Sequence, residues 1–104
     1  ELGLVKISTD GKKQRYTRER NDSNIASKFT DMFRHSVGSI DYAGNIVVIK
    51  TIVGSGSVAG AMIDRLKNKH VLGCVAGDDT VFAVLRTESA AEEMAEQLRE
   101  IAFE

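Results

Sequence analysis

Two adjacent carboxylates, Asp78 and Asp79, follow a glycine in a short turn between two apolar segments. The segments, residues 71–76 and 80–85, are rich in Val, Leu, Phe and Cys, a composition typical of strands packed on a core. One Asp would suffice to cap the turn, and the repulsion between two carboxylates does not help folding. At least one carboxylate is therefore available to a cation, and a guanidinium group matches a carboxylate with two parallel hydrogen bonds. The pair indicates a cation-binding site, with a purely structural polar turn as the alternative.

Metal binding and catalysis are less well supported. Carboxylate oxygens and an imidazole can ligate a divalent metal, but no pair among the candidates has a recognised metal-ligand spacing. A hydrolase requires a nucleophile with an orienting base, and the Ser and Cys residues near the acidic turn have no such neighbour. We therefore predict neither a metal site nor an enzyme. The metal candidates are Asp64, His70, Asp78 and Asp79, and the nucleophile candidates are Ser55, Ser57 and Cys74.

A glycine-rich loop, Gly54-Ser55-Gly56 followed by Gly60, is similar to a dinucleotide-binding turn. Its spacing differs by one residue and its neighbours are predicted hairpins rather than β-α-β units, so we do not predict a nucleotide site. The helix that begins near Ser57 still presents unpaired backbone N–H groups and the positive end of its dipole. These groups can hold a carboxylate.

The elements that position these residues follow from turn signals and hydrophobic periodicity. Apolar residues at helical spacing predict a helix that ends at Leu66, and a capping box of Ser89 and Glu92 predicts a C-terminal helix. Together with two hairpins they give the order β-β-α-β-β-α, in which two helices cover one face of a four-stranded antiparallel sheet. The predicted fold is an α+β two-layer sandwich. Its strands are predicted at residues 40–42, 46–53, 71–76 and 80–85.

The strand predicted at residues 46–53 is nearly continuous in apolar residues. Such a strand is expected to be covered on both faces, by helices on one and by another subunit's sheet on the other. This pattern favours an oligomer.

The N-terminal part is predicted to be a basic hairpin, a linker and a helix. Two short strands, residues 4–7 and 14–17, flank the Asp-Gly turn signal at residues 10 and 11. Residues 18–23 are almost free of apolar side chains, and Asp22 or Ser23 can then cap a helix over residues 24–37. That helix is expected to turn an apolar face toward the core or a subunit interface. The face contains Ile25, Phe29, Met32, Phe33 and Val37.

Charge and composition point to a polyanionic partner and a reducing compartment. Residues 1–20 contain six basic and three acidic side chains, and the remainder of the 104 residues contains eight basic and twelve acidic ones. A basic head on an acidic body suggests that the head faces a polyanion, with a solvated arm as the alternative. Cys74 is the single cysteine, which suits a cytoplasmic protein. There is no long apolar run or signal-peptide pattern, so no membrane association is predicted.

The run GCVAGDDTVF resembles the signature of the arginine repressor family, and the resemblance extends over essentially the whole chain. It implies a domain at residues 24–104 that binds L-arginine as corepressor and forms trimers stacked into hexamers. Residues 1–17 resemble the end of a winged helix-turn-helix domain and its wing, and residues 18–23 form the linker. The chain is thus expected to be a fragment whose operator-binding helices are missing. Weak DNA contacts are expected from the wing residues Lys6, Lys12, Lys13 and Arg15.

The resemblance also implies roles for single residues. Asp78 and Asp79 match the family's paired aspartates, which hold arginine between two trimers, and Asp64 matches a further acidic position of that pocket. Cys74 and Ala76 stand where the family contributes mainly backbone contacts. Two positions depart from the family pattern: Ser57 replaces a Gln or His that touches the ligand's head group, and Val53 replaces a common proline.

The sequence thus predicts an arginine-responsive transcriptional regulator of arginine metabolism, with arginine as effector and no cofactor. The alternatives are an amino-acid-sensing module for a different ligand and, from another class, a metal-dependent enzyme domain.

Overall fold

The computed structural model describes residues 27–104. The chain separates into two compact units, Glu1–Asp31 and Met32–Glu104. The predicted basic hairpin, the linker and the helix cap at Asp22 or Ser23 lie outside the described residues. The second unit contains the whole sheet and the acidic turn.

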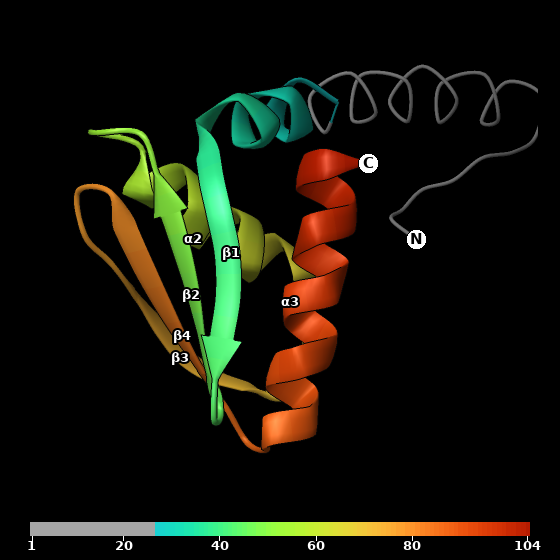
Figure 1. Ribbon diagram of the computed structural model, residues 1–104. Coiled ribbons are helices and arrows are strands. Elements are labelled where there is room, and N and C mark those ends of the chain that lie inside the picture. Colours follow the sequence, from blue (N-terminus) through green and yellow to red (C-terminus); the bar gives the residue numbers. More distant parts are fainter. Residues whose placement is uncertain (1–26) are drawn as a thin grey trace, which may run out of the picture. The chain divides into compact units, whose positions relative to one another are not determined.

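The second unit is an α+β two-layer sandwich, as predicted (Figure 1). A helix at residues 27–36 precedes the sheet. All strand pairs are antiparallel and the spatial order is β1-β2-β4-β3, so β1 and β3 are the two edge strands. The elements are β1 (Val37–Ala43), β2 (Ile46–Thr51), α2 (Gly56–Leu66), β3 (Val71–Ala76), β4 (Thr80–Leu85) and α3 (Glu88–Phe103).

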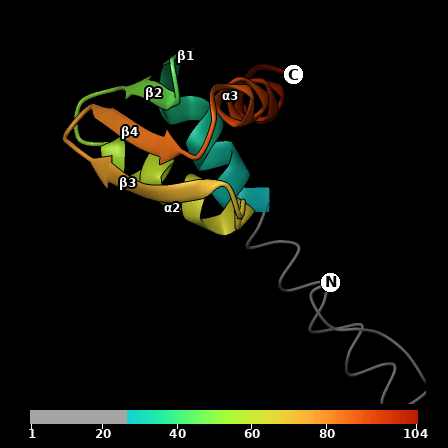
Figure 2. The same cartoon turned by 90° about the horizontal axis from the view of Figure 1, so that it is seen from below.

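Both helices pack on one face of the sheet, α3 beside β1 and α2 beside β3 (Figures 1 and 2). Side chains alternate between the two faces of a strand, and the apolar side chains of β2 and β4 that face the helices are completely buried. Burial of this apolar surface is the main stabilising term of the fold. The largest fully buried side chains are Phe33, Val47, Ile49, Ile63, Val81, Leu85, Met94 and Leu98.

The opposite face of the sheet, which we call the open face, is not covered by any part of residues 32–104. Strand register brings Val48 opposite Phe82, and Phe82 opposite Val75, across three adjacent strands. Phe82 is 50% exposed and Val75 72% exposed. The sequence predicted that β2 is covered on both faces. Within the described residues, the helices cover one face of β2 and the open face is uncovered. The apolar side chains of the open face are Ile46, Val48, Val75, Phe82 and Val84.

Two element boundaries were predicted wrongly. In both cases apolar residues continue past the end of an element into the next segment of the chain, so hydrophobicity does not mark the boundary. Val37 was assigned to the first helix, but it pairs with Thr51 as the first residue of β1. The second strand was extended to Val53, but β2 ends at Thr51, and Gly54 adopts φ +85° in the turn that follows. Val53 is 78% exposed, so its apolar character reflects neither strand pairing nor burial.

The capping box predicted at Ser89 was also wrong. Helix α3 is capped by Thr87, whose hydroxyl accepts a 3.0 Å hydrogen bond from the backbone N–H of Ala90. Thr87 is extended, with φ −140° and ψ 163°, which is the conformation that an N-cap requires. Ser89 lies inside the first turn. The helix therefore begins at Glu88, one residue before the predicted cap.

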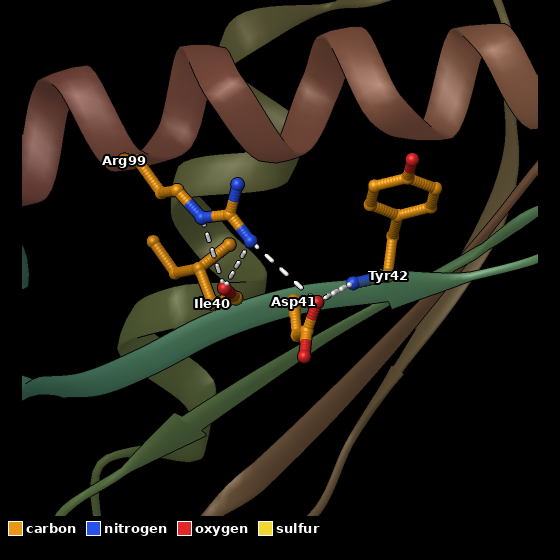
Figure 3. Close-up of polar contacts among 4 residues, drawn as sticks. All are labelled: Ile40, Asp41, Tyr42 and Arg99. Atoms are coloured by element: carbon orange, nitrogen blue, oxygen red, sulfur yellow. Dashed lines mark hydrogen bonds and ion pairs between the residues drawn. The ribbon is translucent and has the colours of Figure 1, made fainter.

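The backbone edge of β1 is closed by a side chain of α3 (Figure 3). Arg99 donates from Nε and Nη2 to the carbonyl oxygen of Ile40, at 3.0 and 2.8 Å, and its Nη2 lies 3.5 Å from Oδ1 of Asp41. That oxygen of Asp41 also accepts a hydrogen bond from the backbone N–H of Tyr42. A charged side chain on an edge strand blocks pairing with a further strand, so Arg99 protects this edge.

Within residues 27–104 no helix is long and apolar enough to span a lipid bilayer.

Candidate functional site

The turn that carries the two aspartates joins β3 to β4. Its closing hydrogen bond runs from the backbone N–H of Gly77 to the carbonyl oxygen of Thr80, at 2.8 Å. Both Asp78 and Asp79 are exposed, so the turn presents two neighbouring negative charges to solvent. The strands on either side have the bounds that the sequence predicted.

The turn is fixed to the β2–α2 loop through its backbone carbonyls. Asp79 O accepts a hydrogen bond from Thr51 N at 2.8 Å, and Asp78 O accepts from Gly54 N at 3.1 Å and from Gly56 N at 3.0 Å. A Cβ atom on Gly56 would collide with the carbonyl oxygen of Gly77. Glycine therefore allows the start of α2 to approach the turn closely, and the two loops form one backbone unit.

The two carboxylates have different surroundings. Oδ1 of Asp79 accepts a 3.0 Å hydrogen bond from the hydroxyl of Thr80, and the same hydroxyl accepts one of 3.4 Å from Nζ of Lys50. Within residues 27–104 the Asp78 carboxylate makes no hydrogen bond or ion pair. Asp79 is thus held by a neighbour, whereas Asp78 is free to turn toward a ligand.

Helix α2 runs along β3, so its start lies near the turn and its end lies farther along the strand. A Cβ atom on Gly60 would lie 3.3 Å from the Cβ atom of Ala76, so this face of α2 touches the strand. Ser57 and Asp64 lie three residues before and four residues after Gly60, on the same helix face. Both are exposed and border the contact with β3, Ser57 near the acidic turn and Asp64 about two helical turns away.

Asp64 lies close enough to Cys74 to influence its ionisation. Burial raises the pKa of the Cys74 thiol, and the negative charge of Asp64 raises it further. Cys74 is the partner of Ala83 in the β3–β4 ladder, so it lies on the helix-facing side of the sheet. Asp64 and Cys74 therefore lie together at one end of the surface between α2 and β3. Ser57 lies at the other end, toward Asp78 and Asp79.

The backbone of β3 offers hydrogen-bonding groups along the same surface. In an antiparallel ladder only alternate residues bond to the partner strand. Because Gly77 bonds to Thr80, the next bonding residues are Val75 and Gly73. The N–H and C=O groups of Cys74 and Ala76 consequently point to the free edge of β3.

The structure bears on two of the sequence interpretations. The start of α2 was expected to present unpaired N–H groups, but the amides of Gly56 and Val58 already donate to Asp78 O and Ser55 O. His70 was grouped with the aspartates as a metal candidate. Within the described part of the chain, no three His, Cys, Asp or Glu side chains gather in a geometry that could hold a metal ion.

Sequence reasoning missed Thr80 and Lys50. The signal for Thr80 was present, because a hydroxyl directly after two aspartates can bond the nearer one. Lys50 could not have been found without the register, which pairs it with Thr80 across two strands distant in sequence.

Comparison with known proteins identifies the family. The family model described as the arginine repressor, C-terminal domain, matches residues 33–100. The chain is 42% identical over 102 residues to an arginine repressor of Alkaliphilus oremlandii, covering 97% of this chain and 68% of the relative. It is 39% identical over 103 residues to an arginine repressor of Thermoanaerobacter sp., covering 97% of this chain and 69% of the relative. This chain belongs to the arginine repressor family.

The family assignment confirms the resemblance found in the sequence. The range matched by the arginine repressor C-terminal domain includes the whole sheet, α2 and the acidic turn. It therefore contains every candidate ligand-binding residue of this chain, whereas the wing residues Lys6, Lys12, Lys13 and Arg15 lie outside both the match and the described residues.

Proposed function

We propose that residues 24–104 form the L-arginine-binding and oligomerisation domain of a transcriptional regulator of arginine metabolism. One observation carries the proposal: the turn is attached to the β2–α2 loop through the backbone carbonyls of the two aspartates, so neither carboxylate is needed for this attachment and both are exposed. A guanidinium group offers five N–H donors and a permanent charge, which suits two adjacent carboxylates. L-arginine acts as effector, and no cofactor or catalytic step is part of the proposal.

The arginine site is proposed to use both ends of the surface between α2 and β3. The cationic group lies at the acidic turn, where Asp78 and Asp79 neutralise it. The backbone groups of Cys74 and Ala76 at the free strand edge supply donors and acceptors for a polar head group. Ser57 and Asp64 complete the site, and Asp64 offers a further carboxylate for an ammonium group.

The open face is proposed to be the trimer interface. A contiguous apolar surface on three adjacent strands is unusual for an isolated domain and marks an interaction surface. The apolar residues of β2 divide accordingly: Ile46 and Val48 face the proposed interface, whereas Val47 and Ile49 are buried beneath the helices. Trimer formation then needs no arginine.

Arginine is proposed to link two trimers into a hexamer. Exposed carboxylates that face one another across an interface repel until a cation lies between them. Because the ligand then binds the assembled state in preference to the separate trimers, it shifts the equilibrium toward hexamer by mass action. Operator DNA is proposed to be bound by a winged helix-turn-helix domain whose wing is residues 1–17. Residues 18–23 are proposed to link this domain to the arginine-binding domain. Residues 1–104 alone then bind DNA only weakly, without sequence specificity.

The test is a calorimetric titration of the 104-residue chain with L-arginine, L-lysine, L-citrulline and a divalent metal salt in turn. We expect heat from arginine without added metal, and little from citrulline, which has no charge to pair with the aspartates. Binding of another amino acid in place of arginine would support a sensor of different specificity, for which Ser57 is the motivating departure from the family pattern. Heat that requires the metal would instead favour the metal-dependent enzyme domain.

A further inference from the structure

The two aspartates of the turn are adjacent in sequence but are not equivalent in structure. Asp79 accepts a hydrogen bond from Thr80, and within residues 27–104 Asp78 has no side-chain partner. A bound cation therefore meets one carboxylate of fixed orientation and one that can rotate. This difference bears on which cations the turn selects.

Thr80 is restrained from two directions. It is the first residue of β4, half-buried, and its register partner on β2 is Lys50. A hydroxyl has one proton and two lone pairs. Lys50 Nζ can only donate to the Thr80 oxygen, and an ionised carboxylate can only accept, so the proton of Thr80 must point to Oδ1 of Asp79.

The hydrogen bond to Thr80 leaves Asp79 able to bind a ligand. A carboxylate has about four lone-pair sites on its two oxygens, and Thr80 uses one of them. The remaining sites still accept two parallel hydrogen bonds from a guanidinium fork. Since such a bidentate pair depends on the orientation of the carboxylate plane, a restrained Asp79 is better prepared for it than a freely rotating one.

We propose that Thr80 is a positioning residue that orients Asp79 for a planar guanidinium group and thereby favours L-arginine over L-lysine. This inference rests on the proposed function as an arginine-binding domain. Lysine's ammonium group is a compact charge with rotatable donors, so it gains little from a fixed carboxylate plane. Asp78, which is free to rotate, attracts either cation.

Three variants of the 104-residue chain separate positioning from folding. Thr80→Val keeps the β-branched shape and removes the hydroxyl, Thr80→Ser keeps the hydroxyl, and Thr87→Val makes the same chemical change at the cap of α3, away from the turn. Each is titrated calorimetrically with L-arginine and with L-lysine, and its thermal unfolding is recorded. The parent chain is measured in parallel.

We expect Thr80→Val to weaken arginine binding by about 3- to 10-fold, the effect of losing one hydrogen bond, and lysine binding by less than about twofold. Thr80→Ser should keep the parental ratio of the two affinities. Thr87→Val should unfold at lower temperature and bind both ligands as the parent does.

An unchanged arginine-to-lysine ratio in Thr80→Val would overturn the inference while leaving arginine binding intact. So would a serine variant that behaves like the valine variant, because the methyl group and not the hydroxyl would then matter. If loss of affinity in Thr87→Val matched that in Thr80→Val, the effect would belong to stability and the inference would fail. A parent chain that binds no arginine would refute the proposed function itself, and this inference with it.

Discussion

The backbone amide of Thr51, the last residue of β2, donates a 2.8 Å hydrogen bond to the carbonyl oxygen of Asp79. Two further amides of the same loop, those of Gly54 and Gly56, donate to Asp78 O. The acidic turn is thus attached to its neighbour by atoms that every residue type possesses. Substitution of either carboxylate should therefore test ligand binding without dismantling the turn.

Asp79→Asn should weaken arginine binding by ~1.5–3 kcal/mol, the usual contribution of a hydrogen bond to a charged group. The amide is isosteric but cannot form a charge-assisted pair, and its neutrality also reduces repulsion between trimers. The variant should therefore form hexamers with little dependence on arginine, while the parent passes from trimer to hexamer as arginine is added. Sedimentation of both proteins with and without arginine measures this. A variant that keeps the parental arginine dependence would show that the turn is structural.

Asp64→Asn should shift the alkylation of Cys74 to lower pH. Burial and then Asp64 raise the pKa of this thiol above its ordinary value of 9.0, and only the thiolate reacts. Removing the charge removes the second cause and leaves the first, so the reaction midpoint should fall but stay above 9.0. The measurement is the iodoacetamide rate between neutral and alkaline pH, with Asp78→Asn as the control that should leave the profile unmoved.

The raised pKa of Cys74 also predicts how the stability of the folded chain depends on pH. Since the pKa of Cys74 is higher in the folded chain than in the unfolded chain, its contribution to stability is complete below the unfolded value and is lost as pH rises through the folded value. Equal midpoints for the parent and Asp64→Asn would place Asp64 away from Cys74.

Phe82→Asp should prevent trimer formation while preserving the fold. Phe82 is 50% exposed at the centre of the open face, so a charge there is tolerated by the monomer but not by an apolar interface. Phe103→Asp is the matched control, because Phe103 is 54% exposed at the end of α3. Sedimentation without arginine should show a monomer for the first variant and a trimer for the second. Trimers of Phe82→Asp would move the interface elsewhere.

Arg99→Met should lower the free energy of unfolding by about 1.5–3 kcal/mol. The substitution removes the two hydrogen bonds that the charged Arg99 side chain donates to the carbonyl oxygen of Ile40. Asp41→Asn should have a much smaller effect, since Asp41 is 81% exposed and its 3.5 Å ion pair is screened by solvent. Urea unfolding followed by circular dichroism compares the two variants. Equal losses would assign the stabilisation to the ion pair.

Thr87→Ala should destabilise the chain by about 1 kcal/mol through loss of the helix cap. Ser89→Ala should change stability little, because Ser89 lies inside the first turn and its position as the predicted cap is wrong. Thermal unfolding of the two alanine variants decides between the caps. A larger effect at Ser89 would restore the capping box.

Much of this fold could be predicted because its signals are local. The bounds of β3 and β4 follow from a charged turn between two apolar runs, and both were confirmed. The end of β2 could not be predicted in this way, because Ile52 and Val53 are apolar yet exposed. The strand ends where its pairing with the acidic turn ends: Thr51 bonds to Asp79, and Gly54 then adopts φ +85° in the following turn. This pairing joins segments far apart in the chain.

The candidate site shows the same limit. Its acidic residues were found from their sequence, since two neighbouring carboxylates have few structural uses. The difference between Asp78 and Asp79 was not, because it depends on Thr80 and on the strand register that brings Lys50 beside it. The sequence shows which charged side chains are present, whereas the strand register determines which of them are restrained by a neighbour.

The main-chain attachment of the acidic turn separates two demands that usually conflict in evolution. The attachment of the turn uses only the carbonyl oxygens at positions 78 and 79, which no substitution removes, whereas the proposed ligand recognition uses the side chains. Mutations that change the effector can therefore accumulate at these two positions without loss of the native state. The turn is a place where one scaffold can acquire responses to new metabolites.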